Sequence, residues 1–480
     1  MGKTSAADGP DLLTSLVHSG DGLGSWNSGS DTGAGGENGG SLAGLGYQTF
    51  GDAPAASGAA KRTYSWRQKL LMLVFSMGSL LAGSCLAMMI PFFPLEAQRR
   101  GISQTLTSGV FSIFSFTQLV TYPVIGRLVP RVGINRLYCI GMSMTAVSNI
   151  VFGLLFRLES ATTFIAACYT VRVFEAIGTA AVITTALTMA ANQFAENTST
   201  AVAVMETMNA IGLSLGAAIG AGLYSLGGFG LPFFSQGCFI LALVVLSVLY
   251  LPEVAVPRRS SGDFWAMLRT FASAGESWLC CAIVFTAAAT WTAIDSSIAR
   301  YASDAIGTTP AQIGLYFLVA TGAYALSSLV WGRLADRLHN TYVMIAGCLF
   351  ATALGLALIP PLPGLGLTPS WWLLGLGLTI KEIFQGGAYV PVLNRMIATA
   401  VRQGLPADVT TQAFTCSVFG TVASVGNVLG PVTAGAIIDA RNFTFMVGCL
   451  ATLASLVGVT SAAQAARVVR RRWSDRGDQT

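Results

Sequence analysis

Residues 212–222 read GLSLGAAIGAG, and a related stretch, GNVLGPVTAG, returns at residues 426–435. A second pair repeats in the same way, with GRLVPR at residues 126–131 and GRLADR at residues 332–337. The first pair is offset by 214 positions and the second by 206. A nearly constant offset in two separate motifs indicates that one ancestral half was duplicated whole.

The composition assigns the chain to the membrane. Of its 480 residues, 53% are hydrophobic and 10% are charged, whereas soluble domains carry roughly 25% charged residues. Duplicated halves within so apolar a chain are typical of a secondary transporter, whose substrate site lies at the repeat interface near the bilayer midplane.

Several functional classes find no support in the sequence. The nine cysteines all fall inside apolar segments, without the spacing of a disulfide framework or a zinc site. There is no P-loop and no nucleophile–base pair, and the two histidines, His18 and His339, lie outside the apolar segments. We therefore expect a protein that is not an enzyme, takes no cofactor or metal, and binds no nucleic acid.

Twelve segments are long and apolar enough to cross a bilayer, which needs about 20 residues of helix. They are 69–93, 106–128, 134–156, 161–190, 200–224, 231–251, 277–301, 311–333, 341–361, 370–398, 409–436 and 441–465. This pattern predicts an all-α membrane protein with two pseudo-symmetric six-helix bundles. The expected parts are a disordered tail (1–65), a first bundle (66–251), a linker (252–276), a second bundle (277–466) and a basic tail (467–480).

The positive charges predict the orientation. On one side of the expected spans the short loops carry most of the Lys and Arg residues, and the other side carries only Arg99, Arg100, Arg157, Arg300 and Arg441. The positive-inside rule then makes both termini cytoplasmic. The run RVVRRR at residues 467–472 fits either ordinary positive-inside charge, which we favour, or anionic lipid binding. In the tail, DGPDLL (8–13) and YQTF (47–50) are short patterns of the kind that sorting adaptors read.

The loop motifs carry a family resemblance. GRLADRLHN (332–340) and GRLVPR (126–131) resemble the loop signature of the major facilitator superfamily. The resemblance implies that a cytoplasmic gate is built from Gly126, Arg127, Arg131, Gly332, Arg333, Asp336 and Arg337. Pro130 stands where the family has Asp, so we expect the first gate to be weaker or differently built.

The repeated glycine stretches resemble the glycine-rich stripe of the antiporters in that superfamily. The stripe residues are Gly212, Gly216 and Gly220 in one half and Gly426, Gly430 and Pro431 in the other. Ala217 stands where the family usually has Pro. Small residues every four positions let two helix backbones approach closely, and we expect these stripes to mark the seams that rock during transport.

Three further stretches are more specific. IPFFPLEAQRRG (90–101), VRVFEAIGTAA (171–181) and VMETMNAIGLSLG (204–216) resemble the vesicular amine transporter family, closest to its vesicular polyamine branch. The resemblance covers about residues 66–465. The monoamine branch carries acids in the first span and in the membrane part of the eleventh, and this chain has none there. The resemblance therefore implies a polyamine rather than a dopamine- or serotonin-type substrate.

Ionisable residues inside a membrane span are costly and functional by default. The candidates are Arg172, Glu175, Glu206, Asp295, Lys381 and Glu382. If Arg172 neutralises one acid and Lys381 another, two carboxylates remain without a counter-ion, and each of these would hold either a proton or a cation. A purely structural role for each acid remains open: an ion pair for Glu175 or Glu382, a hydrogen bond for Glu206, and solvation at a helix end for Asp295.

Aromatic rings can complete a cation site. Trp291 lies one helical turn before Asp295 and is the strongest candidate; Tyr169, Tyr324, Phe384 and Tyr389 are others. Together these features predict a monomeric, proton-coupled antiporter that moves small organic cations, such as spermidine or spermine, across a lipid bilayer into an acidic vesicle. The alternatives are a plasma-membrane multidrug–proton antiporter and a non-transporting receptor on a transporter fold.

Overall fold

A computed structural model describes residues 65–102, 104–251, 263–308, 310–361 and 366–477. The chain divides into two units, residues 1–55 and 56–480, and every described residue belongs to the second. The expected tail up to residue 64, both sorting-type patterns and linker residues 252–262 lie outside the described residues.

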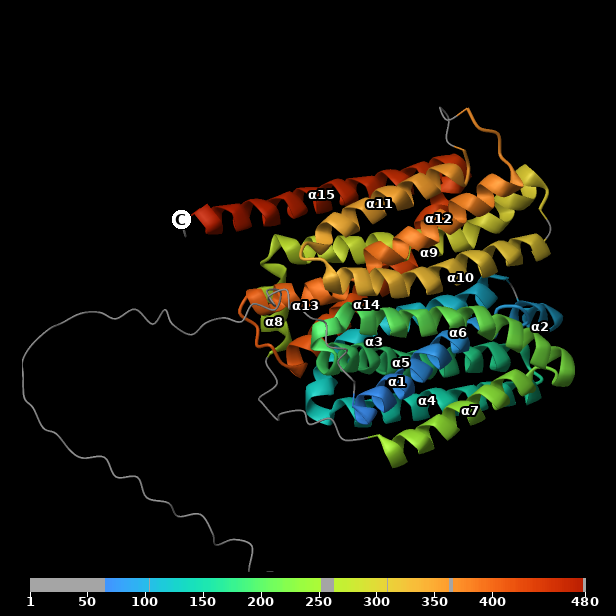
Figure 1. Ribbon diagram of the computed structural model, residues 1–480. Coiled ribbons are helices and arrows are strands. Elements are labelled where there is room, and N and C mark those ends of the chain that lie inside the picture. Colours follow the sequence, from blue (N-terminus) through green and yellow to red (C-terminus); the bar gives the residue numbers. More distant parts are fainter. Residues whose placement is uncertain (1–64, 103, 252–262, 309, 362–365, 478–480) are drawn as a thin grey trace, which may run out of the picture. The chain divides into compact units, whose positions relative to one another are not determined.

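Helices make up nearly all of the described chain (Figure 1). The first half contains α1 (Trp66–Ala87), α2 (Phe93–Arg99), α3 (Gln104–Val132), α4 (Ile134–Leu154), η1 (Leu155–Arg157), α5 (Ala161–Gln193), η2 (Ala195–Asn197), α6 (Thr198–Gly227) and α7 (Gly230–Tyr250). After α8 (Phe264–Ala272), the second half contains α9 (Gly275–Ile306), α10 (Pro310–Arg337), α11 (Thr341–Leu358), α12 (Trp371–Tyr389), α13 (Val392–Arg402), α14 (Val409–Ala440) and α15 (Phe443–Gly477).

Within the described ranges, eleven helices are long and apolar enough to cross a membrane. The remaining predicted span, 370–398, is the pair α12 and α13, which is interrupted at Val390 and Pro391. Pro391 has no N–H for an intrahelical bond, and Lys381 and Glu382 make α12 less apolar than the other spans. The all-α fold with two six-helix halves is therefore confirmed, with its tenth span broken.

Two segment ends differ most from the expectation. The first span, expected over 69–93, ends at Ala87, and the following PFFP stretch contributes to the short helix α2. The last helix, α15, continues to Gly477, so most of the stretch expected as a basic tail (467–480) extends the helix. Hydropathy marks where a helix leaves the bilayer but not where its hydrogen bonding stops, since Arg and Ala are good helix formers in water.

The buried core shows how the two halves meet. We call the end of the bundle near α8 the linker side, where α1 and α9 begin and α3 and α10 end (Figure 1). One large apolar cluster fills this side and takes residues from both halves, including Leu137, Met205, Ile283 and Phe414. On the opposite side each half has its own cluster: one is formed by first-half residues and another by second-half residues. The halves therefore share a core on the linker side and have separate cores on the opposite side.

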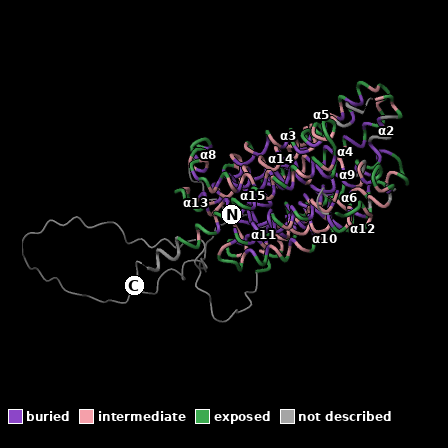
Figure 2. The backbone as a smooth tube through the Cα atoms, turned by 90° about the horizontal axis from the view of Figure 1, so that it is seen from above, coloured by how far each residue is buried: buried purple, intermediate pink, exposed green. Residues whose placement is uncertain are grey.

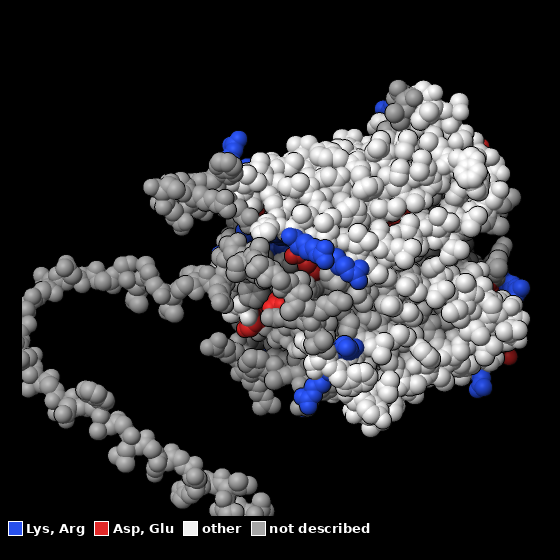
Figure 3. Space-filling model, viewed as in Figure 1, with Lys and Arg blue, Asp and Glu red and all other residues white. Residues whose placement is uncertain are grey.

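The outer surface suits a lipid environment. Buried and exposed residues alternate along the helices (Figure 2), and many exposed residues are large and apolar, such as Phe116, Leu246 and Leu326. On the face seen in Figure 3, most of the surface over the middle of the helices carries no Lys, Arg, Asp or Glu side chain. A helix that exposes apolar side chains over its central turns is stable in hydrocarbon rather than in water.

The first glycine stripe holds α6 against α1. A Cβ atom added at Gly212 would collide with the carbonyl oxygen of Leu80, and one added at Gly216 would lie 2.8 Å from the Cα of Ser84. A Cβ at Gly220 would meet the carbonyl oxygen of Met88. Only glycine allows this backbone approach.

The second glycine stripe does the same for α14 and α9. A Cβ added at Gly426 would lie 2.8 Å from the Cβ of Ala288, and one at Gly430 would lie 2.7 Å from the carbonyl oxygen of Ala289. Pro431 lies inside α14, next to this contact. Both stripes therefore pack helices of the same half together. That they mark the seams that rock during transport stays a prediction.

Candidate functional site

The two halves meet at the gate glycines. A Cβ added at Gly126 of α3 would lie 2.6 Å from the Cβ of Ser417 on α14, and one added at Gly332 of α10 would lie 2.6 Å from the Cβ of Ala203 on α6. These contacts join the first half to the second, and they are equivalent by the internal repeat. Glycine at both positions lets α3 pack against α14, and α10 against α6, on the linker side.

Asp336 ties the second half to the first at this point. Its Oδ1 accepts a hydrogen bond from the backbone N–H of Ser199 at 3.0 Å. Its Oδ2 accepts from the backbone N–H of Thr200 at 2.8 Å and from the Thr200 hydroxyl at 2.6 Å. The carboxylate thus satisfies free N–H groups at the start of α6, where the helix dipole also favours a negative charge. Each charge-assisted bond contributes about 1.5–3 kcal/mol.

The equivalent position in the first half is Pro130, which has no carboxylate. Here the start of α14 is capped by its own Asp408, which accepts from the backbone N–H of Thr411 at 3.0 Å. Arg127 contacts α8 instead: its guanidinium lies 4.4 Å from the ring centroid of Phe264 and 5.2 Å from that of Trp265. The two repeated loops therefore make different contacts, and in the first loop the arginine lies against α8.

α8 is held against α14 by its buried face. Phe264, Met267 and Phe271 recur at helical spacing and are all buried. The rings of Phe264 and Phe271 pack edge-on against Phe414 of α14, at centroid distances of 5.3 and 5.9 Å. The remaining gate residues, Arg131, Arg333 and Arg337, lie at the ends of α3 and α10, and Arg333 Nη1 donates to the Leu329 carbonyl at 3.5 Å.

Further hydrogen bonds join the two halves on the linker side. The Thr207 hydroxyl of α6 lies 2.6 Å from that of Ser328 on α10, and Asn394 Nδ2 donates to the Ser199 hydroxyl at 3.4 Å. Gln412 Nε2 donates to the Ala191 carbonyl at 3.5 Å. The linker side is thus closed by apolar packing and by polar contacts.

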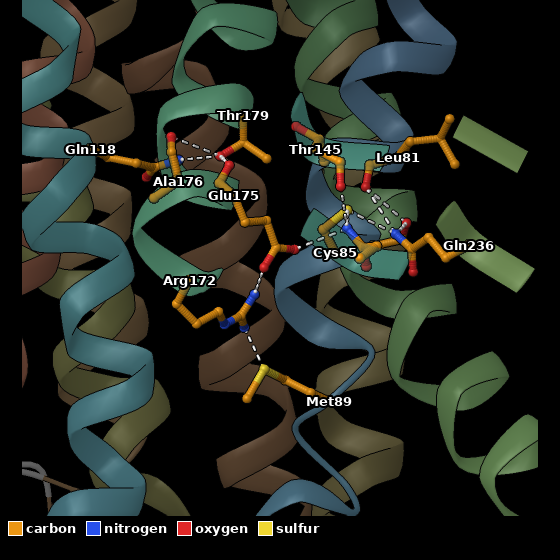
Figure 4. A network of polar contacts seen from close by, with 12 residues as sticks. Leu81, Cys85, Met89, Gln118, Thr145, Arg172, Glu175, Ala176, Thr179 and Gln236 are labelled. Carbon is orange, nitrogen blue, oxygen red and sulfur yellow. Dashed lines mark hydrogen bonds and ion pairs between the residues drawn. The ribbon is translucent and has the colours of Figure 1, made fainter. Parts of the chain in front are cut away.

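Arg172 and Glu175 form a buried pair inside the first half (Figure 4). Their charged atoms are 2.5 Å apart, and both side chains are almost fully buried. The second Glu175 oxygen accepts a hydrogen bond from Asn149 Nδ2 at 3.2 Å, and Arg172 also contacts the sulfur of Met89. Every named partner belongs to the first half, so this carboxylate is neutralised away from the seam.

Lys381 and Glu382 form the corresponding pair in the second half. Lys381 is fully buried, and its Nζ lies 2.6 Å from Glu382 Oε1. The other Glu382 oxygen accepts a hydrogen bond from the indole N–H of Trp291 at 2.7 Å. Gln385, one turn along α12, donates to the Ala287 carbonyl of α9 at 2.7 Å, which fixes the two helices together.

An aromatic cluster of Trp291, Tyr324, Tyr389, Phe419 and Tyr122 lies beside this pair. The ring centroid of Trp291 lies 5.3 Å from that of Tyr324 and 5.2 Å from that of Tyr389. The centroids of Tyr389 and Phe419 are 4.9 Å apart. Tyr122 of the first half packs against the backbone at Gly420, next to Phe419. The Tyr324 hydroxyl is buried and has no hydrogen-bond partner among the described residues, so the cluster holds an unsatisfied polar group.

Glu206 of α6 faces this cluster from the first half. Its charge is within electrostatic range of the hydroxyls of Tyr122, Tyr324 and Tyr389. Its neighbour Ala210 packs against Tyr324, with Trp291 alongside. Among the described side chains, no hydrogen bond or ion pair reaches the Glu206 carboxylate.

Asp295 lies one turn beyond Trp291 on α9, toward the opposite side. It is exposed, and it is within electrostatic range of Lys381 and Glu382. No hydrogen bond joins it to another described residue. The two bases thus neutralise Glu175 and Glu382, and Glu206 and Asp295 are the two carboxylates of this set that have no direct partner among the described residues.

Two members of the cluster, Tyr122 and Phe419, were not expected from the sequence. They come from helices that are distant in the chain and carry no local charge to mark them. Two expected aromatics lie elsewhere: Tyr169 donates its hydroxyl to the Leu106 carbonyl, and Phe384 packs against Trp331.

Comparison with known proteins agrees with this architecture. A family model of the Major Facilitator Superfamily matches residues 75–288 and 279–476. The chain belongs to the major facilitator superfamily. It is 28% identical to the MFS-type transporter SLC18B1 of Mus musculus over 421 residues, which are 86% of this chain and 90% of that protein.

Two other known proteins are also similar. Multidrug resistance protein 2 of Bacillus subtilis (strain 168) is 22% identical over 388 residues, which are 78% of this chain and 90% of that protein. The crystal structure of the human organic anion transporter MFSD10 (TETRAN) has a TM-score of 0.67 at 15% identity, with 83% of this chain and 100% of that chain covered. The likeness to the solved structure supports the fold.

Superfamily membership settles the class of protein. The chain is a multi-pass membrane transporter and not an enzyme. The resemblance to the vesicular amine transporter family is confirmed by the similarity to SLC18B1 of mouse, rat and human.

Proposed function

We propose that this transporter exchanges protons for organic cations, with polyamines as the substrate class, and that it loads an acidic vesicle. The observation that carries the proposal is the Glu206 carboxylate, which has no hydrogen-bond or ion-pair partner in the described part of the chain and lies beside an aromatic cluster between the two halves. A carboxylate beside an aromatic cluster is suited to an ammonium group, because carboxylates and aromatic rings both attract a cation. When no ammonium group is bound, the same carboxylate is stabilised by a proton.

The coupling follows from mutual exclusion. A carboxylate that holds a proton does not hold an ammonium, so proton binding from one side releases the cation to that side. Each pH unit across the membrane contributes about 1.4 kcal/mol per exchanged proton, which concentrates a substrate about tenfold. Because the halves have separate cores on the opposite side, Asp295 is exposed there and can exchange protons with that compartment.

Several acids on different helices favour a substrate with more than one ammonium group. Glu206, Asp295 and Glu382 come from α6, α9 and α12, and none is adjacent to another in sequence. A flexible chain with spaced ammonium groups can reach such scattered carboxylates, whereas a monoamine needs one. Lys381 holds Glu382 in this state, so a second ammonium at Glu382 would replace that lysine.

The orientation and location belong to the same proposal. The linker side and both termini face the cytoplasm, and the opposite side faces the vesicle lumen. The sorting-type patterns at residues 8–13 and 47–50 would then lie where adaptors bind. The protein acts as a monomer, because each chain contains both halves of the site.

Uptake into proteoliposomes tests the proposal. The full chain is reconstituted in vesicles that are acidic inside, and uptake of spermidine and serotonin is measured. We expect gradient-driven spermidine uptake that exceeds serotonin uptake, and we expect it to be lost when Glu206→Gln and Asp295→Asn are combined. Absence of spermidine uptake would overturn the substrate class, and unaltered uptake in the double variant would overturn the site.

A multidrug–proton antiporter of the plasma membrane is the second candidate. The similarity to Multidrug resistance protein 2 favours it, and the aromatic cluster would also accept a hydrophobic cation. A fluorescently tagged chain distinguishes the two, since the multidrug function requires a signal at the cell surface and export of hydrophobic cations. The vesicular function requires an intracellular signal.

A further inference from the structure

The second half contains a pocket on the linker side, away from the aromatic cluster. It has a volume of about 590 Å³ and is formed between the start of α9, the end of α13 and the middle turns of α15. Its lining includes Trp278 and Leu279 of α9, Gln403 after α13, and Gln464 and Arg467 of α15. None of these residues belongs to the gate or to the aromatic cluster.

The pocket has a polar end and an apolar end. α9 runs away from the linker side and α15 runs back toward it, so Gly275 lies level with Arg467, and Ala282 lies level with Thr460. With a rise of 1.5 Å per residue, the pocket extends about 10 Å along the helices from Gly275 to Ala282. Arg467 and Gln464 lie toward the outer end together with Glu276, and Leu279, Ala282, Ala463 and Thr460 lie toward the deeper end.

The pocket is lined by one acid and one base, Glu276 and Arg467, and the acid is paired with Arg402 outside the lining. Glu276, its acidic lining residue, is already engaged: both of its oxygens lie 2.8 Å from Arg402 Nη2, and one accepts from the Tyr342 hydroxyl at 2.6 Å. Arg467 is exposed and has no ion pair among the described side chains. An anion that enters the pocket therefore meets an uncompensated guanidinium.

The position of the pocket matches the surface of the bilayer. Trp278 lies at its mouth, is 65% exposed and donates its indole N–H to the Ala272 carbonyl at 2.9 Å. The membrane-spanning part of α9 begins at Gly275. Tryptophan is enriched where membrane helices leave the hydrocarbon, so the polar end lies at the level of the lipid headgroups.

We propose that this pocket binds one anionic phospholipid. The phosphate pairs with Arg467 and accepts hydrogen bonds from the amides of Gln403 and Gln464. An acyl chain follows the aliphatic wall of Leu279, Ala282 and Ala463. Basic pockets between membrane helices bind anionic headgroups in this way. The inference depends on the chain spanning a membrane and not on the substrate it carries.

Thermal unfolding of the purified full chain tests the site. Phosphatidylserine or phosphatidylcholine is added to the protein in detergent, and the midpoint of unfolding is measured. We expect phosphatidylserine to raise the midpoint by about 3 °C more than phosphatidylcholine, because a ligand of the folded state stabilises it. Arg467→Ala and the groove-filling Ala463→Phe should each abolish this difference.

Arg470→Ala is the matched control. It removes the same charge from the same helix, one turn further on and outside this pocket, and it should keep the full difference between the two lipids. Equal losses in Arg467→Ala and Arg470→Ala would overturn the site in favour of general surface charge. Equal stabilisation by water-soluble glycerophosphoserine would overturn the lipid in favour of a free phosphate.

Discussion

Six ionisable side chains in the membrane spans divide into two kinds. Arg172 with Glu175, and Lys381 with Glu382, are neighbours on their own helices and neutralise each other. Glu206 and Asp295 have no direct partner among the described residues. A paired buried charge maintains the fold, whereas an unpaired carboxylate is available to a proton or a cation. The two kinds should respond differently to substitution.

Glu206→Gln should reduce transport without destabilising the protein. The amide cannot hold a charge, so the attraction for an ammonium is lost, and we expect gradient-driven spermidine uptake to fall at least about tenfold. The midpoint of thermal unfolding should not fall, because the carboxylate loses no hydrogen bond. Glu159→Gln, at an exposed position, is the matched control and should transport normally. Normal uptake by Glu206→Gln would contradict this assignment.

Glu175→Ala, unlike Glu206→Gln, should destabilise the protein. It leaves the Arg172 guanidinium buried without a counter-ion, which costs about 3–5 kcal/mol. We expect a markedly lower unfolding midpoint in detergent, and partial recovery when Arg172→Met removes the orphaned charge as well. An unchanged midpoint in Glu175→Ala would show that the pair does not stabilise the first half.

At the scale of the elements, glycines allow two kinds of helix contact: some lie within one half, and others join the two halves. The glycine stripes hold α6 on α1 and α14 on α9, and the gate glycines hold α3 on α14 and α10 on α6. We propose that each half moves as a rigid body while the contacts between the halves change. The asymmetry lies in how the seams are locked: Asp336 holds one, and α8 packs beside the other.

Gly212→Ala should destabilise the first half. The new methyl group meets the backbone of α1, and overpacking of this kind costs about 1–3 kcal/mol. Gly222→Ala, on the same helix with open space around it, should be neutral or slightly stabilising because alanine favours the helix. Unfolding midpoints of the two variants measure the difference, and equal midpoints would refute the packing role of the stripe.

In the Phe264→Ala variant, the linker side should open more often than in the unaltered protein. The variant loses ring contacts to Arg127 and Phe414, together about 1 kcal/mol, so we expect the modification rate of Cys416 by a membrane-impermeant maleimide to rise about fivefold. Cys416 is buried on α14 beside Thr188 of α5, at the contact between the halves. Mass spectrometry identifies the modified cysteine. Arg269→Ala, on the exposed face of α8, is the control; an equal rate in both variants would show that α8 does not lock the seam.

Sequence patterns predicted the parts of the site that depend on local spacing. Hydropathy located the membrane segments, and spacing paired Arg172 with Glu175 because residues three apart share a helix face. The partners of the glycine stripes and the docking of α8 were not predicted, since each depends on which distant helix packs opposite. The break at Pro391 has a local cause, but hydropathy does not register it. Tyr122 and Phe419 joined the aromatic cluster for the same reason.

At the scale of the whole transporter, the structure is closed on the linker side and has separate cores on the opposite side. This state exposes Asp295 on the side that we propose faces the lumen. In an acidic lumen such a state would take up protons and release the cation. The return step requires the contacts of Asp336 and α8 to break, so that Glu206 meets the other side.

The most direct test of proton–cation exchange follows the protons. Proteoliposomes that are acidic inside and contain a pH-sensitive dye are clamped at zero membrane potential, and spermidine is added outside. We predict that spermidine triggers proton efflux, seen as a rise in internal pH, and that the combined Glu206→Gln and Asp295→Asn variant abolishes it. Entry of labelled spermidine without a change in internal pH would contradict the exchange mechanism.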